Sequence, residues 1–85
     1  MDIHNMKCTQ YFLQIKERPD RARIKEEWIE ETIRTPLHTE LQSDSRVRKW
    51  KWIMEEEKYL RVILLADGET VHNAFSTGVL RRGYS

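Results

Sequence analysis

The stretch KYLRVILLADGETVHNAF, residues 58–75, decides the fold. Two runs suited to β-strands, residues 58–65 and 70–75, flank the pair Asp67-Gly68. The Asp-Gly pair is typical of the type I′ turn of a two-residue hairpin, because both central positions of that turn need a positive φ. The stretch therefore predicts an antiparallel β-hairpin that reverses at Asp67-Gly68.

A two-residue loop also fixes which residues face each other across this hairpin. The expected pairs are Ala66 with Glu69, Leu64 with Val71, Val62 with Asn73, and Leu60 with Phe75. Most of these side chains are large and apolar, so helices should cover the face on which they lie. Arg61 and His72 then point to the opposite face as diagonal neighbours. A guanidinium beside an imidazole is a candidate site for a phosphate group.

Two helical patterns precede this hairpin. In the first, over about residues 7–17, apolar side chains recur at helical spacing until Pro19 prevents continuation. In the second, over about residues 24–34, an apolar stripe lies opposite a row of glutamates, and Thr35-Pro36 ends it. Asp20 can cap one further turn between them. Both helices are expected to pack on one face of the sheet.

The period of the sequence changes after the second helix. We expect a strand over residues 38–42, a turn at Ser43-Asp44-Ser45 and a strand over residues 46–53. The chain is therefore predicted to be a single α+β domain, residues 1–85. In it, two N-terminal helices pack on one face of a three- to four-stranded antiparallel meander over about residues 38–75. Residues 76–85 form a tail.

The charged loop at residues 54–57 leaves the register of the strand before it open. If the loop that joins the two strands has an even number of residues (an even loop), four aromatic and basic side chains lie on the Arg61 face, namely Arg46, Arg48, Trp50 and Trp52. Such a platform can stack bases and hold phosphates. An odd loop instead buries the two tryptophans and brings Lys49 and Lys51 beside Arg61. Burial favours the odd loop, because buried tryptophans stabilise a small core and buried lysines cost free energy.

Composition limits the classes of function. The 85 residues include 15 Lys and Arg against 14 Asp and Glu, so bulk charge gives no case for a polyanion binder. One cysteine, Cys8, excludes an intramolecular disulfide, and no His or Cys pair has metal-ligand spacing, so we expect no metal and no cofactor. The absence of a signal-like or membrane-spanning run predicts a cytoplasmic protein. The thin stability of so small a domain favours a partner or a homo-oligomer.

Four stretches carry a resemblance to a known family. They are Arg18-Pro19-Asp20-Arg21, Glu27-Trp28-Ile29, Tyr59-Leu60-Arg61-Val62, and DGETVHNAF at residues 67–75. Over most of residues 11–76, the chain resembles a family of uncharacterised small bacterial proteins that is similar in outline to the RelE- and BrnT-like toxins. Those toxins are metal-independent ribonucleases built as helices followed by an antiparallel sheet. The resemblance implies a toxin that acts on RNA through its open sheet face and is masked by a small antitoxin protein.

Carried over onto this sequence, the resemblance implies that Arg61, His72 and Arg48 are the catalytic positions. A metal-free ribonuclease must activate a ribose 2′-OH, stabilise charge on phosphorus and protonate the leaving oxygen. We expect His72 to exchange the proton and Arg61 to hold the phosphate, with Arg48 as a third residue. The residues expected to bind RNA are Lys49, Lys51, Arg81 and Arg82. A tail residue, Arg81, Arg82 or Tyr84, supplies a second acid–base group only if the tail folds back.

Two other functions fit the same residues. A non-catalytic protein-interaction module would dock a protein on the same sheet face or on the edge strand at residues 38–42. A nucleic-acid platform would bind RNA without cutting it. In purely structural terms, His72 is an ordinary strand residue, and Arg61 forms a surface ion pair with a glutamate of residues 55–57 or of the second helix.

Overall fold

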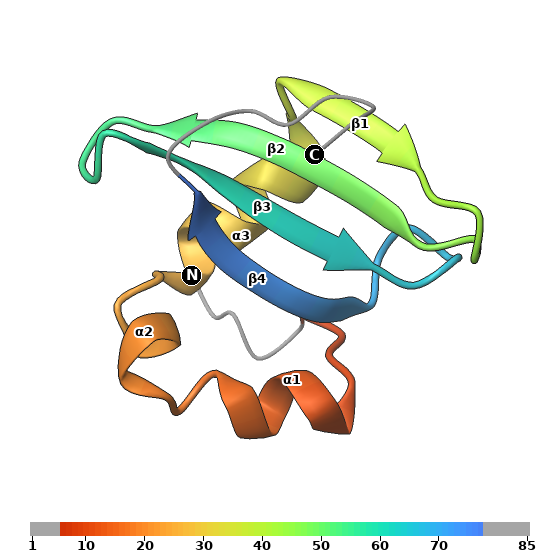
Figure 1. Cartoon of the computed structure of the whole chain (residues 1–85), viewed down its shortest axis with the longest axis horizontal. Coiled ribbons are helices and arrows are strands. Elements are labelled where there is room, and N and C mark those ends of the chain that lie inside the picture. Colours follow the sequence, from red (N-terminus) through yellow and green to blue (C-terminus); the bar gives the residue numbers. More distant parts are fainter. Residues whose placement is uncertain (1–5, 78–85) are drawn as a thin grey trace.

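Residues 6–77 are described in the computed structural model, in which short helices precede a four-stranded sheet (Figure 1). The elements are α1 (Gln10–Ile15), α2 (Pro19–Ala22), α3 (Glu26–Arg34), β1 (His38–Leu41), β2 (Val47–Ile53), β3 (Lys58–Leu64) and β4 (Val71–Thr77). The α+β class and the antiparallel sheet predicted from the sequence are confirmed. The first two residues of the predicted tail belong to β4, and residues 78–85 lie outside the described part of the chain.

The strands lie in the sheet in the order β1-β2-β3-β4, and each pair is antiparallel. Residues 7–9 add a short extended segment to β4 through a parallel bridge between Cys8 and Val71. The Thr9 N–H donates to the Val71 carbonyl at 2.9 Å, and the Val71 N–H donates to the Lys7 carbonyl at 2.8 Å. The chain before α1 is therefore part of the sheet edge and not part of the helix.

Capping and proline chemistry set the bounds of the helices. Thr9 caps α1, because its hydroxyl oxygen accepts the Phe12 N–H at 3.1 Å. Pro19 ends this first helical region and starts α2, since proline fits the first turn of a helix. The expected extra turn is therefore present, but Arg18 is its N-cap residue and Asp20 lies inside its first turn, so the predicted capping role of Asp20 is wrong. Arg34 and the following Thr35-Pro36 end α3 as predicted.

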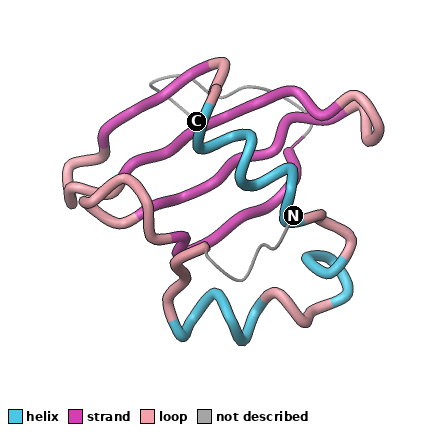
Figure 2. Tube along the Cα trace, turned by 180° about the vertical axis from the view of Figure 1, so that it is seen from behind, coloured by secondary structure: helices cyan, strands magenta, loops and turns pink. Residues whose placement is uncertain are grey.

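The helices cover different parts of the sheet. α3 crosses β2 and β3, whereas α1 and the short α2 lie along the β4 side (Figures 1 and 2). One apolar core joins them. Its members are Phe12, Ile15, Ile24, Trp28, Ile29, Ile53, Leu60, Val62, Leu64, Val71 and Ala74. The other face of the sheet is turned away from α3 and is called the far face below.

The first hairpin forms as predicted. Its turn lies at Ser43-Asp44-Ser45, and the Gln42 N–H donates to the Arg46 carbonyl at 2.7 Å. Ser45 has a φ of 75°, in the left-handed region. The Asp44 carboxylate accepts the Arg46 N–H at 3.1 Å and stabilises the reversal.

The second hairpin reverses over four residues, so the predicted two-residue type I′ turn is wrong. The Leu65 N–H donates to the Thr70 carbonyl at 2.9 Å across this loop. Gly68 has a φ of 71°, but Asp67 is not in the positive-φ region. Its carboxylate instead accepts the N–H groups of Glu69 and Thr70 at 2.9 and 3.0 Å and the Thr70 hydroxyl at 2.6 Å. This local bonding by an aspartate side chain replaces the expected turn.

A β-bulge in β4 then shifts the predicted pairing by one residue. Leu64 pairs with Val71 as expected, but Ile63 pairs with Asn73, so His72 is an extra residue between them. The pairs beyond the bulge are Arg61 with Phe75, Val62 with Ala74, and Leu60 with Ser76. The predicted pairs of Val62 with Asn73 and Leu60 with Phe75 are therefore wrong.

β2 adopts the even-loop register, so the odd loop that burial favours is wrong. Trp50 pairs with Arg61, and Ile53 pairs with Lys58 across a four-residue turn. Trp50 and Trp52 therefore lie on the far face, and the alternating Lys49 and Lys51 lie on the α3 face.

The C-terminus of α3 explains why lysines are stable on its side of the sheet. The Lys49 ammonium donates to the Ile33 carbonyl at 2.8 Å, and the Lys51 ammonium donates to the Thr35 carbonyl at 3.2 Å. Carbonyl groups at the end of a helix lack internal partners and attract cations. The aliphatic stems pack while the ammonium groups reach these acceptors, so the desolvation cost that argued against the even loop does not arise.

Candidate nucleic-acid interface

One residue of each strand contributes to a row across the far face. β1 gives His38, β2 gives Trp50, β3 gives Arg61 and β4 gives Phe75, and each is the direct partner of the next. This row places a cation between two aromatic rings. It exists because the even loop sets β2 against β3 and because the bulge moves Phe75 out of the core.

The Arg61 guanidinium packs on both aromatic neighbours. Its central carbon lies 4.3 Å from the Phe75 ring centroid and 5.9 Å from the Trp50 ring centroid. Arg21 of α2 approaches the same Phe75 ring at 5.4 Å. Cation–π contacts of this kind hold a guanidinium in one orientation while its N–H groups stay at its edge, where a phosphate binds.

The two tryptophans of β2 differ in exposure. Trp50 has 0% of its surface exposed although it lies outside the main apolar core, and its ring lies 5.2 Å from that of His38. Trp52 is 42% exposed and meets Tyr59 edge to face at 5.1 Å. Trp50 therefore anchors the far face, whereas Trp52 and Tyr59 can present a ring to a base.

His38 and Glu40 form an acid–base pair that the sequence analysis missed. The His38 Nε2 and a Glu40 carboxylate oxygen lie 3.1 Å apart, with both side chains partly buried. Arg48 is the direct partner of Glu40 on β2, and Arg61 is one strand further on. The sequence signal for this pair is that His38 and Glu40 are two positions apart in a strand, which places both side chains on the same face of the sheet.

His72 is held at the β4 edge and is not a neighbour of Arg61. Its Nδ1 lies 3.2 Å from the Thr9 hydroxyl, and its ring stacks on Tyr11 of α1 at 5.0 Å. Arg61 instead faces Phe75, which is three residues or about 10 Å further along β4. Burial lowers the pKa of His72, and the nearby charge of Arg46 lowers it further.

The other predicted site residues divide between the two faces. Arg48 lies on the far face with Arg61. Lys49 and Lys51 lie on the α3 face, where their ammonium groups are bound, so the structure does not bring them to Arg61. Arg81 and Arg82 lie outside the described residues.

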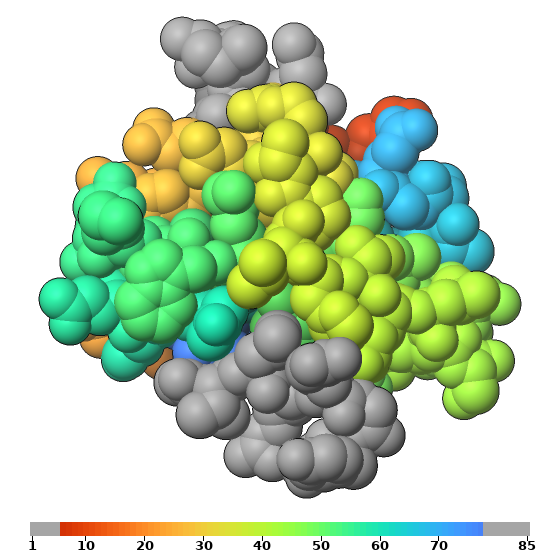
Figure 3. Space-filling view, turned by 90° about the horizontal axis from the view of Figure 1, so that it is seen from above, coloured from red at the N-terminus to blue at the C-terminus, as the bar shows by residue number. Residues whose placement is uncertain are grey.

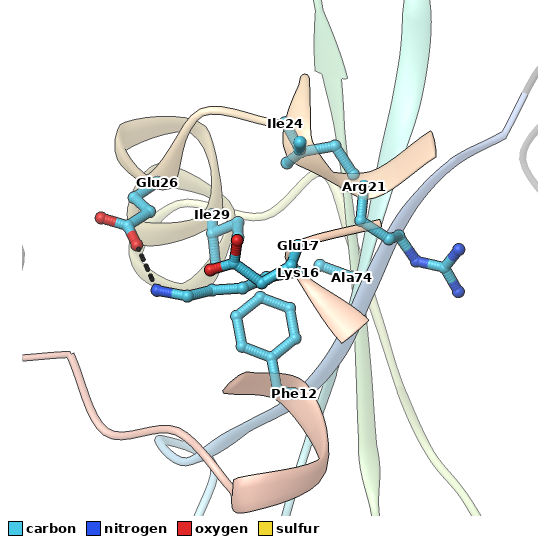
Figure 4. A pocket seen from close by; sticks show the side chains of 9 residues that line it. Phe12, Lys16, Glu17, Arg21, Ile24, Glu26, Ile29 and Ala74 are labelled. Atoms are coloured by element: carbon cyan, nitrogen blue, oxygen red, sulfur yellow. Dashed lines mark hydrogen bonds and ion pairs between the residues drawn. The ribbon is translucent and has the colours of Figure 1, made fainter. Parts of the chain in front are cut away.

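A pocket of about 290 Å³ lies between the helices and β4 (Figure 4). Phe12, Ile24, Ile29 and Ala74 give it an apolar lining. The charges at its rim are partly matched, because the Lys16 ammonium lies 3.5 Å from the Glu26 carboxylate. Because part of its charged lining is already paired within the chain, this pocket is a weaker candidate than the far face.

Metal and thiol chemistry have no support within residues 6–77. No cluster of three or more His, Cys, Asp or Glu side chains is placed to hold a metal ion there. Burial raises the pKa of Cys8, and its thiol lies 3.7 Å from the Met6 carbonyl. A thiol of raised pKa is a poor nucleophile.

Comparison with known proteins gives no match to a family model, to a curated protein or to a solved structure. Within the described part of the chain, no helix is both long and apolar enough to cross a membrane.

Proposed function

We propose that the chain is a cytoplasmic ribonuclease toxin of the RelE- and BrnT-like kind, which binds single-stranded RNA on the far face and is masked by a small antitoxin. The row from His38 to Phe75 carries the proposal, because it combines a stacked guanidinium with aromatic rings and an imidazole. Arg61 and Arg48 hold the phosphate, and the exposed ring of Trp52 and the half-buried ring of Tyr59 stack on bases.

In this proposal, His38 and Glu40 take the proton-transfer role that the sequence analysis gives to His72. The His38 imidazole accepts the proton of a ribose 2′-OH, and Glu40 stabilises the resulting imidazolium. The 2′ oxygen attacks phosphorus, the bond to the 5′ oxygen breaks, and that oxygen takes a proton from solvent. The arginines stabilise the charge that grows on the phosphate oxygens.

The test uses purified protein, a labelled single-stranded RNA and a metal chelator. We expect wild-type protein to cut the RNA and His38→Gln to slow cutting by about 10²-fold or more without loss of binding. Arg48→Gln should weaken binding, whereas Arg18→Gln, at an exposed arginine away from the far face, should change neither property. Circular dichroism checks that each variant is folded.

A growth experiment tests the biological role. Induction of the gene alone should arrest growth, and His38→Gln should relieve the arrest while His72→Gln does not. RNA that is bound in a salt-sensitive way and recovered intact would overturn the cleavage step and support a passive platform. Normal growth together with no RNA binding would overturn the proposal and favour a protein-interaction module.

A further inference from the structure

A groove lies between α3 and the turn that joins β2 to β3, away from the far-face row. Its volume is about 440 Å³, within the size range of binding sites. The lining residues are Glu27, Trp28, Glu30, Glu31, Arg34, Trp52, Ile53, Met54 and Glu55. Figure 3 shows this side of the molecule, with α3 in orange to yellow beside the β2–β3 turn in green.

The groove is acidic. Four glutamates and one arginine line it, and none of the four glutamates lies within ion-pair distance of a Lys or Arg of residues 6–77. The chain as a whole has a formal net charge of +1, so this excess of negative charge is local. Such a surface attracts a cationic ligand and repels the phosphates of RNA.

The groove also presents apolar anchors. Met54 is 76% exposed and Trp52 is 42% exposed, although both are large apolar side chains. Methionine adapts its shape to different partners, and tryptophan is a frequent anchor of protein interfaces. Met54 and Trp52 therefore offer apolar contacts beside the glutamates of the groove.

At this groove, one edge of β2 has no neighbouring strand and one buried side-chain donor has no acceptor among the described residues. β1 begins opposite Trp50, so Lys51 to Ile53 of β2 have no neighbouring strand on that side within the described sheet. Trp28 is 6% exposed, and its buried indole N–H has no acceptor among residues 6–77. Buried donors normally have a partner, so Trp28 is an exception among the residues that line the groove.

We propose that this groove binds a segment of a partner protein in which Lys or Arg residues alternate with apolar side chains. The basic groups meet the glutamates of α3 and of the turn, and the apolar groups pack on Met54 and Trp52. This interaction goes beyond the proposed RNA activity, because it needs a negatively charged surface that repels RNA. Trp52 contributes to both surfaces, but the glutamates and Met54 belong to the groove and not to the far-face row.

The test measures the anisotropy of a labelled synthetic peptide of leucine and lysine, beside a matched peptide with glutamate in place of lysine. We expect the lysine peptide alone to bind, with an affinity that falls as salt is added. The double variant Glu31→Lys/Glu55→Lys should weaken binding at least about tenfold. Both positions are exposed, so the fold should be retained.

Matched control variants separate binding in the groove from the effects of net charge and of exposed apolar side chains elsewhere. The single variants Glu31→Lys and Glu17→Lys change the net charge equally, but only Glu31 lines the groove, so Glu31→Lys should weaken binding and Glu17→Lys should leave it unchanged. Met54→Ser should weaken binding, whereas Leu41→Ser should not, although Leu41 is equally exposed at 75%. Equal effects of groove and control variants would overturn the proposal. Self-association that Glu31→Lys dissolves would overturn it too, because the occupant would then be a second copy of the chain.

Discussion

Arg61 and Phe75 face each other across β3 and β4, with the guanidinium carbon 4.3 Å from the ring centroid. Trp50 lies on the other side of Arg61 in the same row. A long flexible side chain is thereby held between two rigid rings. The far face is therefore organised before any ligand binds, which lowers the entropy cost of recognising a phosphate.

A double-mutant cycle should detect this contact in the stability of the protein. Phe75→Leu keeps an apolar side chain but removes the ring, and Arg61→Met keeps the stem but removes the charge. We expect a coupling free energy of about 0.5–2 kcal/mol between the two positions in urea denaturation. Additive effects of the two changes would show that the guanidinium gains nothing from the ring.

The lysines beneath α3 should differ in their contribution to folding. Lys49→Met keeps the stem but removes the 2.8 Å bond to the Ile33 carbonyl, so the free energy of unfolding should fall by about 1–2 kcal/mol. The bond of Lys51 to Thr35 lies in a more exposed setting and is longer, at 3.2 Å. Lys51→Met serves as the matched control and should cost less. An equal loss at both positions would contradict a specific role for the Lys49 bond.

The sequence predicted the elements of the fold better than their register. Proline positions, the helical period and the turn at Ser43-Asp44-Ser45 are local signals, and the elements that they indicate are present. The bulge at His72 is not a local signal. It accompanies the pairing of residues 7–9 with β4, which joins positions more than 60 residues apart.

The candidate site depended on that register. One extra residue in β4 separates His72 from Arg61 and brings Phe75 to Arg61 in its place. The two tryptophans lie on the far face because the lysines on the opposite face find acceptors. These acceptors are carbonyls at the C-terminal end and C-cap of α3, which no pattern within β2 reveals. The pair of His38 and Glu40 was open to prediction, since a spacing of two within a strand places both on one face.

Ser45 should be a position where glycine stabilises the protein. Its φ of 75° lies in the left-handed region, which costs an ordinary residue about 1 kcal/mol and costs glycine little. We expect Ser45→Gly to raise the free energy of unfolding by about 0.5 kcal/mol after the larger unfolded-state entropy of glycine is subtracted. Ser43→Gly in the same turn lacks a positive φ to relieve and should give no gain. A gain at both positions would contradict this explanation.

Asp67 should make the protein less stable in acid. Hydrogen bonds from the Thr70 hydroxyl, the Thr70 N–H and the Glu69 N–H lower the pKa of Asp67 to about 2. A carboxyl whose pKa is lower in the folded state adds stability above its unfolded pKa of about 3.9, and this stability is lost as the pH falls through the folded value. Urea midpoints measured across this range should fall less steeply for Asp67→Asn than for wild type. Thr70→Val removes the leading donor and should move the pKa back toward its ordinary value.

His72 should titrate below an ordinary histidine in an NMR titration of its ring. Burial at the β4 edge and the charge of Arg46 both disfavour its protonated form. The folded state therefore binds the proton less readily than the unfolded state, and stability should decline as the pH falls below the unfolded pKa of about 6.5. Arg46→Gln should raise the pKa of His72, and His72→Gln should remove this part of the pH dependence. A pKa at or above the ordinary value would contradict the burial argument, and it would make His72 again a candidate for proton transfer near neutral pH.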